Sequence, residues 1–226
     1  YFINNDRLRF YDFNSFFVKF GEKNVINPKL RFLGDLYISP DYMDYLAEDL
    51  IGYVKPFASK NRKCIVLDLD NTLWGGIIGE DGINNIKLDD KPPGNSFLEF
   101  QKYLLALNKR GIILAVNSKN NYEDAIQVIR EHPYMVLKEE NFACIKINWK
   151  NKVQNMIDIA NEINIGLDSL VFFDDDDLNR ELVRQSLPEV LVVNLPKDSS
   201  EYVETLKGLN DFNTLQITDE DFQKGE

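Results

Sequence analysis

The sequence predicts an α/β protein built on a doubly wound, mostly parallel sheet. Short continuous apolar runs, typical of strands covered on both faces, alternate from residue 61 onward with segments whose apolar residues recur at helical spacing. Strand, helix and strand in repeated succession favour parallel strands joined by crossover helices. With 44% hydrophobic and 28% charged residues, the composition is that of an ordinary globular protein. We therefore expect a core domain over residues 61–226.

The first sixty residues differ in composition and are predicted to form an accessory lobe, residues 1–60. Fourteen of the 27 aromatic residues fall there. Aromatic side chains in such number usually pack, so we expect the lobe to lie against the main body or a neighbouring chain. One helix is expected in it, with Ser39 as N-cap, Pro40 in the first helical position and Pro56 at its end.

In the core domain each expected element follows from its own pattern. Apolar runs predict the strands, and apolar residues at helical spacing predict the helices, the first of which Gly111 closes. The expected strands cover residues 64–67, 112–116, 144–147, 170–173 and 190–193. The expected helices cover residues 97–107, 121–131, 151–163 and 178–185. The polar tail from Asn210 is assigned no element.

Charge and rare residues exclude several classes of protein. The formal net charge of −11 argues against a protein that binds the phosphate backbone of nucleic acids. With His132 as the one histidine, neither a three-histidine zinc site nor a two-histidine, one-carboxylate iron site can be built. No apolar run approaches the roughly 18 residues of a membrane span. Cys64 and Cys144 are too few for a disulfide framework and neither belongs to a CxxC pair, so we expect a cytoplasmic protein. From the charge and the apolar runs we expect no nucleic-acid and no membrane partner.

Polar side chains stand at the ends of four expected strands. Asp68 and Asp70 follow the first strand and Ser118 follows the second. Lys152 opens the helix after the third strand, and four aspartates, residues 174–177, follow the fourth. Ligands of doubly wound sheets bind at the carboxyl ends of the strands. Since Asp68 and Asp70 lie two residues apart in a strand that is leaving the sheet, both side chains can face one crevice.

Three or four carboxylates in one pocket predict a magnesium site. Asp68, Asp70, Asp174 and Asp175 would repel one another without a cation, and hard oxygen ligands suit Mg²⁺. Mg²⁺ bound there would draw charge from phosphate oxygens and orient the phosphate for in-line attack. The sequence therefore predicts an enzyme that acts on a phosphorylated small molecule.

Each polar residue has an expected role. With no histidine to serve as base for a serine or cysteine, Asp68 is the expected nucleophile and would form an aspartyl-phosphate. Asp70 would protonate the leaving oxygen and then activate water. The Ser118 hydroxyl and the Lys152 ammonium would hold the phosphoryl oxygens. Two other interpretations stay open: Ser118 as a helix N-cap, and Lys152 as a surface lysine on an exposed first turn.

These motifs, in this order, resemble those of the haloacid dehalogenase (HAD) superfamily over about residues 62–195. The signature hhhhDxDxT stands here as IVLDLDNTL, Ser118 fits the second motif, Lys152 the third, and Asp174-Asp175 the fourth. A closer resemblance is to the FkbH-like branch (HAD subfamily IIIC). Its hallmarks look like KCIVLDLDNTLWGGIIGEDG at 63–82, NSKN at 117–120, INWKNK at 147–152, NIGLDSLVFFDD at 164–175 and ITDED near 217.

The resemblance implies a HAD-like, Rossmann-type fold and a magnesium-dependent phosphatase or phosphotransferase. Members of the FkbH-like branch are associated with moving a glyceryl unit from a phosphorylated three-carbon donor to an acyl carrier protein, with loss of phosphate. An acyl carrier protein is therefore an expected partner, and Cys144 is the thiol to test if the transfer needs one. Where the branch commonly reads DDNP, this chain has four aspartates, of which Asp176 and Asp177 are expected to be helix-start charges.

The spacing of the motifs predicts a site without a cap domain. The 47 residues between Asp70 and Ser118 and the 33 between Ser118 and Lys152 are used up by the expected helices and strands. Such an open site could admit a macromolecular partner or a long prosthetic arm. Three other functions stay open: a simple small-molecule phosphatase, a receiver-type phospho-switch, and a module that binds a partner without catalysis. A phospho-switch would need an acceptor aspartate after the third strand, where residues 145–149 have none.

Overall fold

The computed structural model describes residues 11–54, 62–209 and 212. The chain divides into two compact units, Tyr1–Asn61 and Arg62–Glu226, and each is described by itself. The Pro56 helix end, the ITDED segment near Ile217 and most of the tail from Asn210 lie outside the described residues.

The first unit is a small helical unit with an aromatic core. Its elements are α1 (Phe13–Phe20), α2 (Glu22–Val25), α3 (Pro28–Gly34), the 3₁₀ helix η1 (Pro40–Tyr42) and α4 (Met43–Val54). Phe16 and Val25 are buried at its centre, and neighbouring rings pack edge to face, as Phe13 does on Phe17. Ser39 makes no side-chain cap, so the expected helix begins as a 3₁₀ turn at Pro40 and becomes α-helical at Met43.

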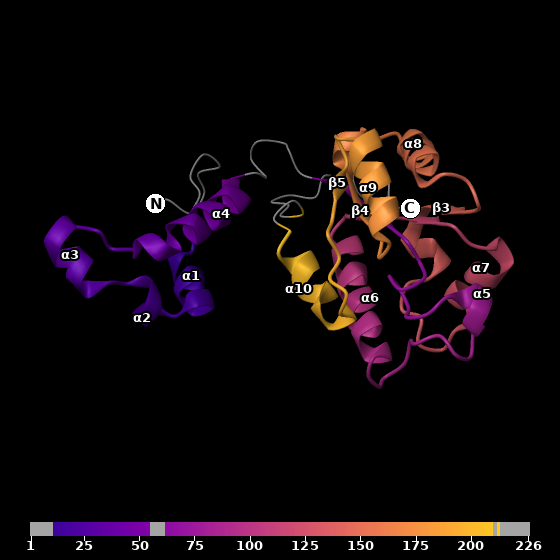
Figure 1. The fold of residues 1–226 in the computed structure, drawn as a ribbon, viewed down its shortest axis with the longest axis horizontal. Coiled ribbons are helices and arrows are strands. Elements are labelled where there is room, and N and C mark those ends of the chain that lie inside the picture. Colours follow the sequence, from indigo (N-terminus) through magenta and orange to yellow (C-terminus); the bar gives the residue numbers. More distant parts are fainter. Residues whose placement is uncertain (1–10, 55–61, 210–211, 213–226) are drawn as a thin grey trace, which may run out of the picture. The chain divides into compact units, whose positions relative to one another are not determined.

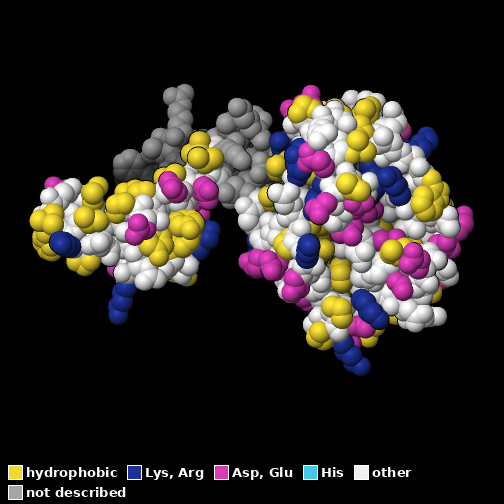
Figure 2. All heavy atoms as spheres, in the orientation of Figure 1, with side chains coloured by type: hydrophobic (Ala, Val, Ile, Leu, Met, Phe, Trp, Pro, Cys, Tyr) yellow, Lys and Arg dark blue, Asp and Glu magenta, His cyan; other side chains and the backbone are white. Residues whose placement is uncertain are grey.

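Many apolar side chains of the first unit are exposed. Figure 2 shows hydrophobic side chains gathered over its surface. Those more than half exposed are Val18, Phe32, Leu33, Tyr37, Ile51 and Val54.

The second unit contains the predicted sheet. Its strands are β1 (Cys64–Leu67), β2 (Ile113–Ser118), β3 (Phe142–Ile147), β4 (Leu170–Phe173) and β5 (Leu191–Val192). They form one five-stranded sheet in the order β3-β2-β1-β4-β5, and every pair is parallel. The predicted doubly wound α/β fold is confirmed. The strand order reverses between β1 and β4, which is the place where ligands of such sheets bind.

Helices cover both faces of this sheet, as Figure 1 shows. The helices are α5 (Ile78–Asp81), α6 (Gly94–Asn108), α7 (Tyr122–Glu131), α8 (Lys152–Ile163), α9 (Asp177–Ser186) and α10 (Tyr202–Lys207), with 3₁₀ turns η3 (Glu139–Asn141), η4 (Leu167–Ser169) and η5 (Ser199–Glu201). Within residues 62–209, the connections between β1 and β3 hold only α5, α6, α7 and η3, so they contain no inserted cap. None of the described helices is long and apolar enough to cross a membrane.

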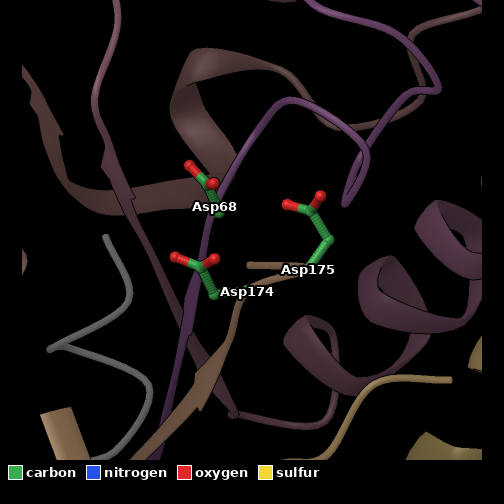
Figure 3. A group of neighbouring side chains, drawn as sticks. All are labelled: Asp68, Asp174 and Asp175. Carbon is green, nitrogen blue, oxygen red and sulfur yellow. The ribbon is translucent and has the colours of Figure 1, made fainter. Parts of the chain in front are cut away.

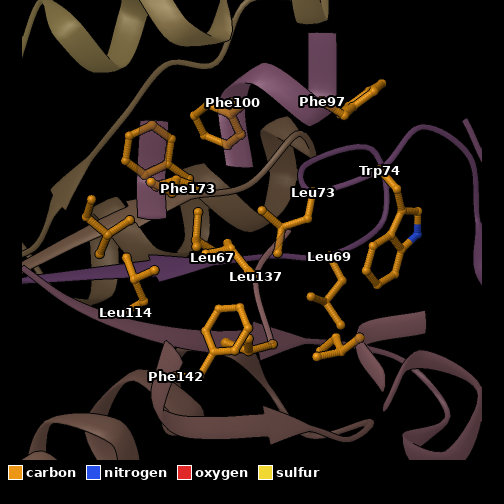
Figure 4. Packing of buried hydrophobic residues seen from close by; sticks show 14 of the residues in the cluster. Leu67, Leu69, Leu73, Trp74, Phe97, Phe100, Leu114, Leu137, Phe142 and Phe173 are labelled. Carbon is orange, nitrogen blue, oxygen red and sulfur yellow. The ribbon is translucent and has the colours of Figure 1, made fainter. Parts of the chain in front are cut away.

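Alternate residues of the central strands build two separate cores. Ile65 and Leu67 of β1 face α6, α7 and α10, whereas Cys64 and Val66 face α8 and α9. Figure 4 shows the first of these cores, where rings from α6 meet Phe173 of β4. Burial on both faces explains why these strands read as continuous apolar runs. β1 and β4 pair in parallel, with Cys64 opposite Leu170 at one end and Leu67 opposite Phe173 at the other.

Candidate functional site

Three aspartates gather where β1 and β4 end. The backbone N–H of Asp68 donates to Phe173 O over 2.9 Å, which carries the pairing of the two strands one residue past the sheet. Asp68, Asp174 and Asp175 each offer a carboxylate oxygen within 4.8 Å of the others. Figure 3 shows the three side chains directed to this common region. Asp68 is 8% exposed and Asp174 is fully buried, so little solvent separates their charges.

Lys152 lies between two of these carboxylates. Its Nζ is 2.8 Å from Asp68 Oδ1 and 2.7 Å from Asp174 Oδ2, and it donates to the carbonyl oxygen of Asn117 over 2.9 Å. The three N–H donors of the ammonium therefore face three acceptors. The side chain is 1% exposed, so the interpretation of Lys152 as a surface lysine is wrong.

Burial and mutual repulsion raise the pKa values of the clustered carboxyls. Burial, with repulsion from Asp68 and Asp174, raises the pKa of Asp175 from 3.8 to about 6, against opposing hydrogen bonds. Burial and Asp68 also raise the pKa of Asp174, although Lys152 opposes them. Burial pulls the pKa of Lys152 down, but the two carboxylates outweigh it and the net shift is upward. The site thus holds more negative charge than Lys152 can balance.

We expect Asp175→Asn to stabilise the metal-free protein at pH 8. The carboxyl of Asp175 holds its proton more tightly in the folded protein, where its pKa is about 6, than in the unfolded chain, where it is 3.8. Ionising Asp175 therefore lowers the free energy of unfolding as pH rises from about 4 through 6. Removing this charge should add on the order of 1–2 kcal/mol to the free energy of unfolding above pH 6, after allowance for solvent screening, and little at pH 4. Urea unfolding in EDTA across pH 4–8 measures the difference.

Asp177→Asn is the matched control for this experiment. Asp177 is an exposed aspartate of the same run and should change stability by no more than about 0.5 kcal/mol. Equal stability of Asp175→Asn and the wild type at pH 8 would contradict a strained carboxylate cluster.

Asp70 does not join the group of three. Its Oδ1 accepts hydrogen bonds from Trp74 Nε1 over 2.8 Å and from the Ile78 N–H over 3.1 Å. Its Oδ2 accepts from Asn120 Nδ2 over 2.8 Å. Burial raises the pKa of Asp70 and repulsion from Asp68 adds to it, while these three hydrogen bonds oppose the shift. A carboxyl that is held in place and has a raised pKa is suited to give and take a proton.

Ser118 is the last residue of β2 and is almost fully buried, at 1% exposure. Its carbonyl oxygen accepts from the Asn148 N–H over 3.1 Å. The N-cap of the following helix, α7, is Asn121, so the interpretation of Ser118 as an N-cap is wrong. Next to it, Asn117 receives a hydrogen bond from Asn155 over 3.1 Å and donates to the Lys152 carbonyl oxygen over 3.0 Å. These hydrogen bonds join the C-terminal end of β2 to the first turn of α8.

The two extra aspartates of the fourth motif have partners away from the group of three. Asp176 caps α9 by accepting from the Leu178 N–H over 2.8 Å. Asp177 forms an ion pair with Arg180, whose other donor reaches the carbonyl oxygen of Asp174 over 2.5 Å. Both are helix-start charges, as predicted. The four-aspartate run therefore supplies two carboxylates to the site and two to the helix.

Several site residues escaped the sequence reasoning. Trp74 and Asn120 hold Asp70, and Asn155 supports Asn117 beside Lys152. Their types carry no signal of catalysis, although Trp74 and Asn120 fall inside the stretches that resemble the FkbH-like branch. His132 is the C-cap residue of α7 and is buried. Cys144, on β3, is buried in the core beside α8, so it is not placed as a reactive thiol.

The donor set fits a hard divalent cation. Apart from the ion pairs with Lys152, Asp68 Oδ1 and Asp174 Oδ2 are buried without a hydrogen-bond partner. Lys152 supplies one positive charge against three carboxylates, so their mutual repulsion is only partly offset and a divalent cation would offset the rest. Three carboxylates and no cysteine or histidine make an oxygen-only set, which suits Mg²⁺ rather than a softer metal.

Comparisons with known proteins agree with this fold. No protein-family model matches the chain, and no curated protein does. A solved structure does match: the N-terminal part of the protein BF1531 from Bacteroides fragilis, which contains a phosphatase domain and is complexed with Mg. It is 37% identical with a TM-score of 0.84, over 91% of this chain and 55% of that one. This chain thus spans about half the length of the N-terminal part of BF1531 that it matches.

Two further likenesses are too remote to bear on function. One is an uncharacterized protein from Corynebacterium glutamicum, at 14% identity and a TM-score of 0.45, covering 69% of this chain and 98% of that one. The other is 3-deoxy-D-manno-octulosonate 8-phosphate phosphatase from Moraxella catarrhalis, at 16% identity and a TM-score of 0.41. It covers 71% of this chain and 95% of that one. The similarity to the BF1531 structure is the one that we use below: over nine-tenths of its length, this chain is similar to a structure that contains a phosphatase domain.

Proposed function

We propose that this chain is a magnesium-dependent phosphatase of the HAD type that acts through an aspartyl-phosphate on Asp68. The observation that carries the proposal is the group of Asp68, Asp174 and Asp175 around buried Lys152 at the switch point of the sheet. The similarity to a Mg-complexed structure that contains a phosphatase domain supports it. So does the order of the four motifs along the chain.

Four residues of this chain divide the proposed chemistry. A carboxylate oxygen of Asp68 attacks phosphorus, and the bond from phosphorus to the leaving oxygen breaks. Asp70 gives its proton to that oxygen, then takes one from the water that attacks the phosphorus and releases Asp68. Lys152 keeps Asp68 in place and offsets its charge, and Ser118 lies at the neighbouring strand end to hold a phosphoryl oxygen.

Asp68, Asp174 and Asp175 would hold the magnesium ion. When bound, Mg²⁺ supplies positive charge to the phosphoryl oxygens as negative charge develops on them. The same ion offsets the repulsion that raises the pKa values of Asp174 and Asp175. Magnesium is therefore expected both to activate and to stabilise the protein.

Release of inorganic phosphate from acetyl phosphate tests this function. We expect turnover by the wild type with Mg²⁺, loss of turnover in EDTA, and its return when Mg²⁺ is added back. Mg²⁺ should also raise the midpoint of thermal unfolding of the wild type, and Asp175→Asn should lose most of that rise. A wild type that binds Mg²⁺ but releases no phosphate would favour a module without catalysis. Stable phosphorylation without release would favour a phospho-switch.

Trp74 is a positioning residue, and its loss should change the pH profile. Trp74→Phe removes the indole donor to Asp70 Oδ1, and a hydrogen bond to a carboxylate lowers its pKa. We expect the acidic limb of the kcat profile, where Asp70 must lose its proton to act as base, to move to higher pH, with kcat at pH 7 falling about tenfold. Turnover of a phosphate monoester from pH 5 to 9 measures this shift. A uniform fall in kcat with an unmoved profile would mean that Trp74 only supports the fold.

Glyceryl transfer to an acyl carrier protein is the finer expectation of the FkbH-like resemblance. The two cysteines, Cys64 and Cys144, are 0% and 3% exposed and lie in the core, which argues against a thiol relay on this chain. Intact-mass measurement of a carrier protein incubated with the chain, Mg²⁺ and phosphorylated three-carbon donors tests the transfer. A glyceryl adduct would establish it, and phosphate release alone would leave the chain a simple phosphatase.

A further inference from the structure

A pocket of about 500 Å³ lies beside Asp70, at the carboxyl ends of β2 and β3. It is lined by Asn120 and Asn121 after β2, by the first turn of α7, and by Ile147, Asn148 and Trp149 at the end of β3. Asn120 belongs to both places, because it lines the pocket and also donates to Asp70. The pocket therefore adjoins the carboxyl that would protonate a leaving group.

The wall of the pocket presents an exposed aromatic face. Trp149 is 71% exposed, whereas tryptophan side chains are highly buried on average. Its indole N–H donates to Asn121 Oδ1 over 3.2 Å, and Asn121 in turn donates to Asp124 over 3.2 Å. These two bonds restrict the orientation of the indole. Tyr122, 45% exposed, adds a second ring to the lining.

The charges of the pocket are all negative. Its two charged residues are Glu123 and Asp124, and no lysine, arginine or histidine is among the lining residues that the structure describes. The other polar side-chain groups of the lining are the amides of three asparagines, which both donate and accept hydrogen bonds, the hydroxyl of Tyr122 and the indole N–H of Trp149. An indole face, amides and carboxylates together suit the C–H face and hydroxyls of a sugar or polyol, and an amino substituent equally.

We propose that this pocket holds the leaving group of the phosphatase reaction, and that the leaving group is an uncharged or amino-bearing sugar or polyol stacked on Trp149. The proposal rests on the proposed function, since the phosphoryl group must lie at Asp68 for its ester oxygen to reach Asp70. A leaving group that carries a carboxylate or a second phosphate would meet Glu123 and Asp124 and be disfavoured.

Paired substrates of one shape test this selectivity. With wild type and Mg²⁺, kcat/KM for glucose 1-phosphate and glucosamine 1-phosphate should exceed that for glucuronic acid 1-phosphate by about tenfold, because the last carries a carboxylate. Glu123→Gln should reduce that ratio by about fivefold. Equal kcat/KM values for glucose 1-phosphate and glucuronic acid 1-phosphate with the wild type would overturn the proposal.

Substitutions of Trp149 test the stacking surface. Trp149→Ala should lower kcat/KM for glucose 1-phosphate about tenfold, while Trp149→Phe keeps most of it. Acetyl phosphate has no sugar, so its hydrolysis should change by no more than about twofold in both variants. If Trp149→Ala lowered kcat/KM for glucose 1-phosphate and for acetyl phosphate by the same factor, the residue would have a general role and the pocket assignment would fail. If the wild type did not hydrolyse acetyl phosphate at all, the proposed function itself would fail.

Fluorescence gives a second measurement that needs no turnover. The chain has two tryptophans, and Trp74 is fully buried, so an exposed indole that responds to added sugar is Trp149. We expect Asp68→Asn to show a saturable change in emission with glucosamine or glucose and a much weaker one with glucuronate at equal ionic strength. The change should vanish in Asp68→Asn with Trp149→Phe. Its persistence there, or equal responses to glucuronate and glucose, would overturn the proposal.

Discussion

Asp68→Asn is expected to lower phosphate release from acetyl phosphate by at least about 10⁴-fold, because the amide cannot attack phosphorus. The substitution keeps the size and shape of the side chain. It also leaves the hydrogen bond from the backbone N–H of residue 68 to the carbonyl oxygen of Phe173 in place. We therefore expect the near-UV circular dichroism of the variant to match that of the wild type. Phosphate release with Mg²⁺ in excess measures the effect.

Asp177→Asn is the control for this loss. It removes an aspartate from the same end of the sheet, but one that forms an ion pair with Arg180 at the start of α9. Its phosphate release should stay within about twofold of the wild type, since the Asp177 side chain is 84% exposed and is not one of the three grouped carboxylates. If Asp68→Asn kept more than about one-hundredth of the wild-type rate, Asp68 would not be the nucleophile.

Lys152→Met is expected to destabilise the metal-free protein by about 3–5 kcal/mol at pH 8. Methionine nearly preserves the volume of the side chain but leaves the carboxylates of Asp68 and Asp174 buried without their cation. Loss of Lys152 raises the folded pKa of Asp174 further, so stability is lost as pH rises through that value. The difference between variant and wild type should therefore shrink toward pH 5, where the carboxyls take up protons.

Urea unfolding in EDTA at pH 5 and pH 8, followed by the fluorescence of buried Trp74, measures this difference. Lys150→Met is the matched control: Lys150 is exposed two residues earlier, and its loss should cost no more than about 0.5 kcal/mol. Mg²⁺ should restore part of the lost stability, because it supplies positive charge to the same carboxylates. Equal costs for the two variants at pH 8, or a cost for Lys152→Met that does not depend on pH, would contradict the buried ion pairs.

The fold could be predicted because its strands are buried on both faces. A strand that must present apolar side chains to two helical layers reads as an unbroken apolar run, and β4 lies at the predicted residues 170–173. Shorter or less regular apolar patterns predicted their elements less accurately. The predicted last strand, 190–193, contracts to Leu191–Val192, where β5 pairs with β4 alone. The short helix α10 has too few turns for a periodic signal, so it was not predicted.

The candidate site was predictable in its strand ends and not in its side-chain directions. The spacing of Asp68 and Asp70 predicts that both face one crevice. Sequence does not show that the indole of Trp74 and the amide of Asn120 hold the carboxylate of Asp70, which is therefore not one of the three grouped carboxylates. Lysine at the start of a helix is ordinarily exposed, and Lys152 is buried because Asp68 and Asp174 lie across from it. Both outcomes depend on contacts between residues far apart in the sequence.

The central claim is a covalent phosphoryl group on Asp68, and chemical trapping tests it most directly. Acid quenching during turnover of acetyl phosphate with Mg²⁺, followed by borohydride, would reduce an aspartyl-phosphate to homoserine, and peptide mass mapping would locate it. We predict homoserine at position 68 in the wild type and at no position in Asp68→Asn. Homoserine at position 70 or 175, or none during measured phosphate release, would contradict the claim.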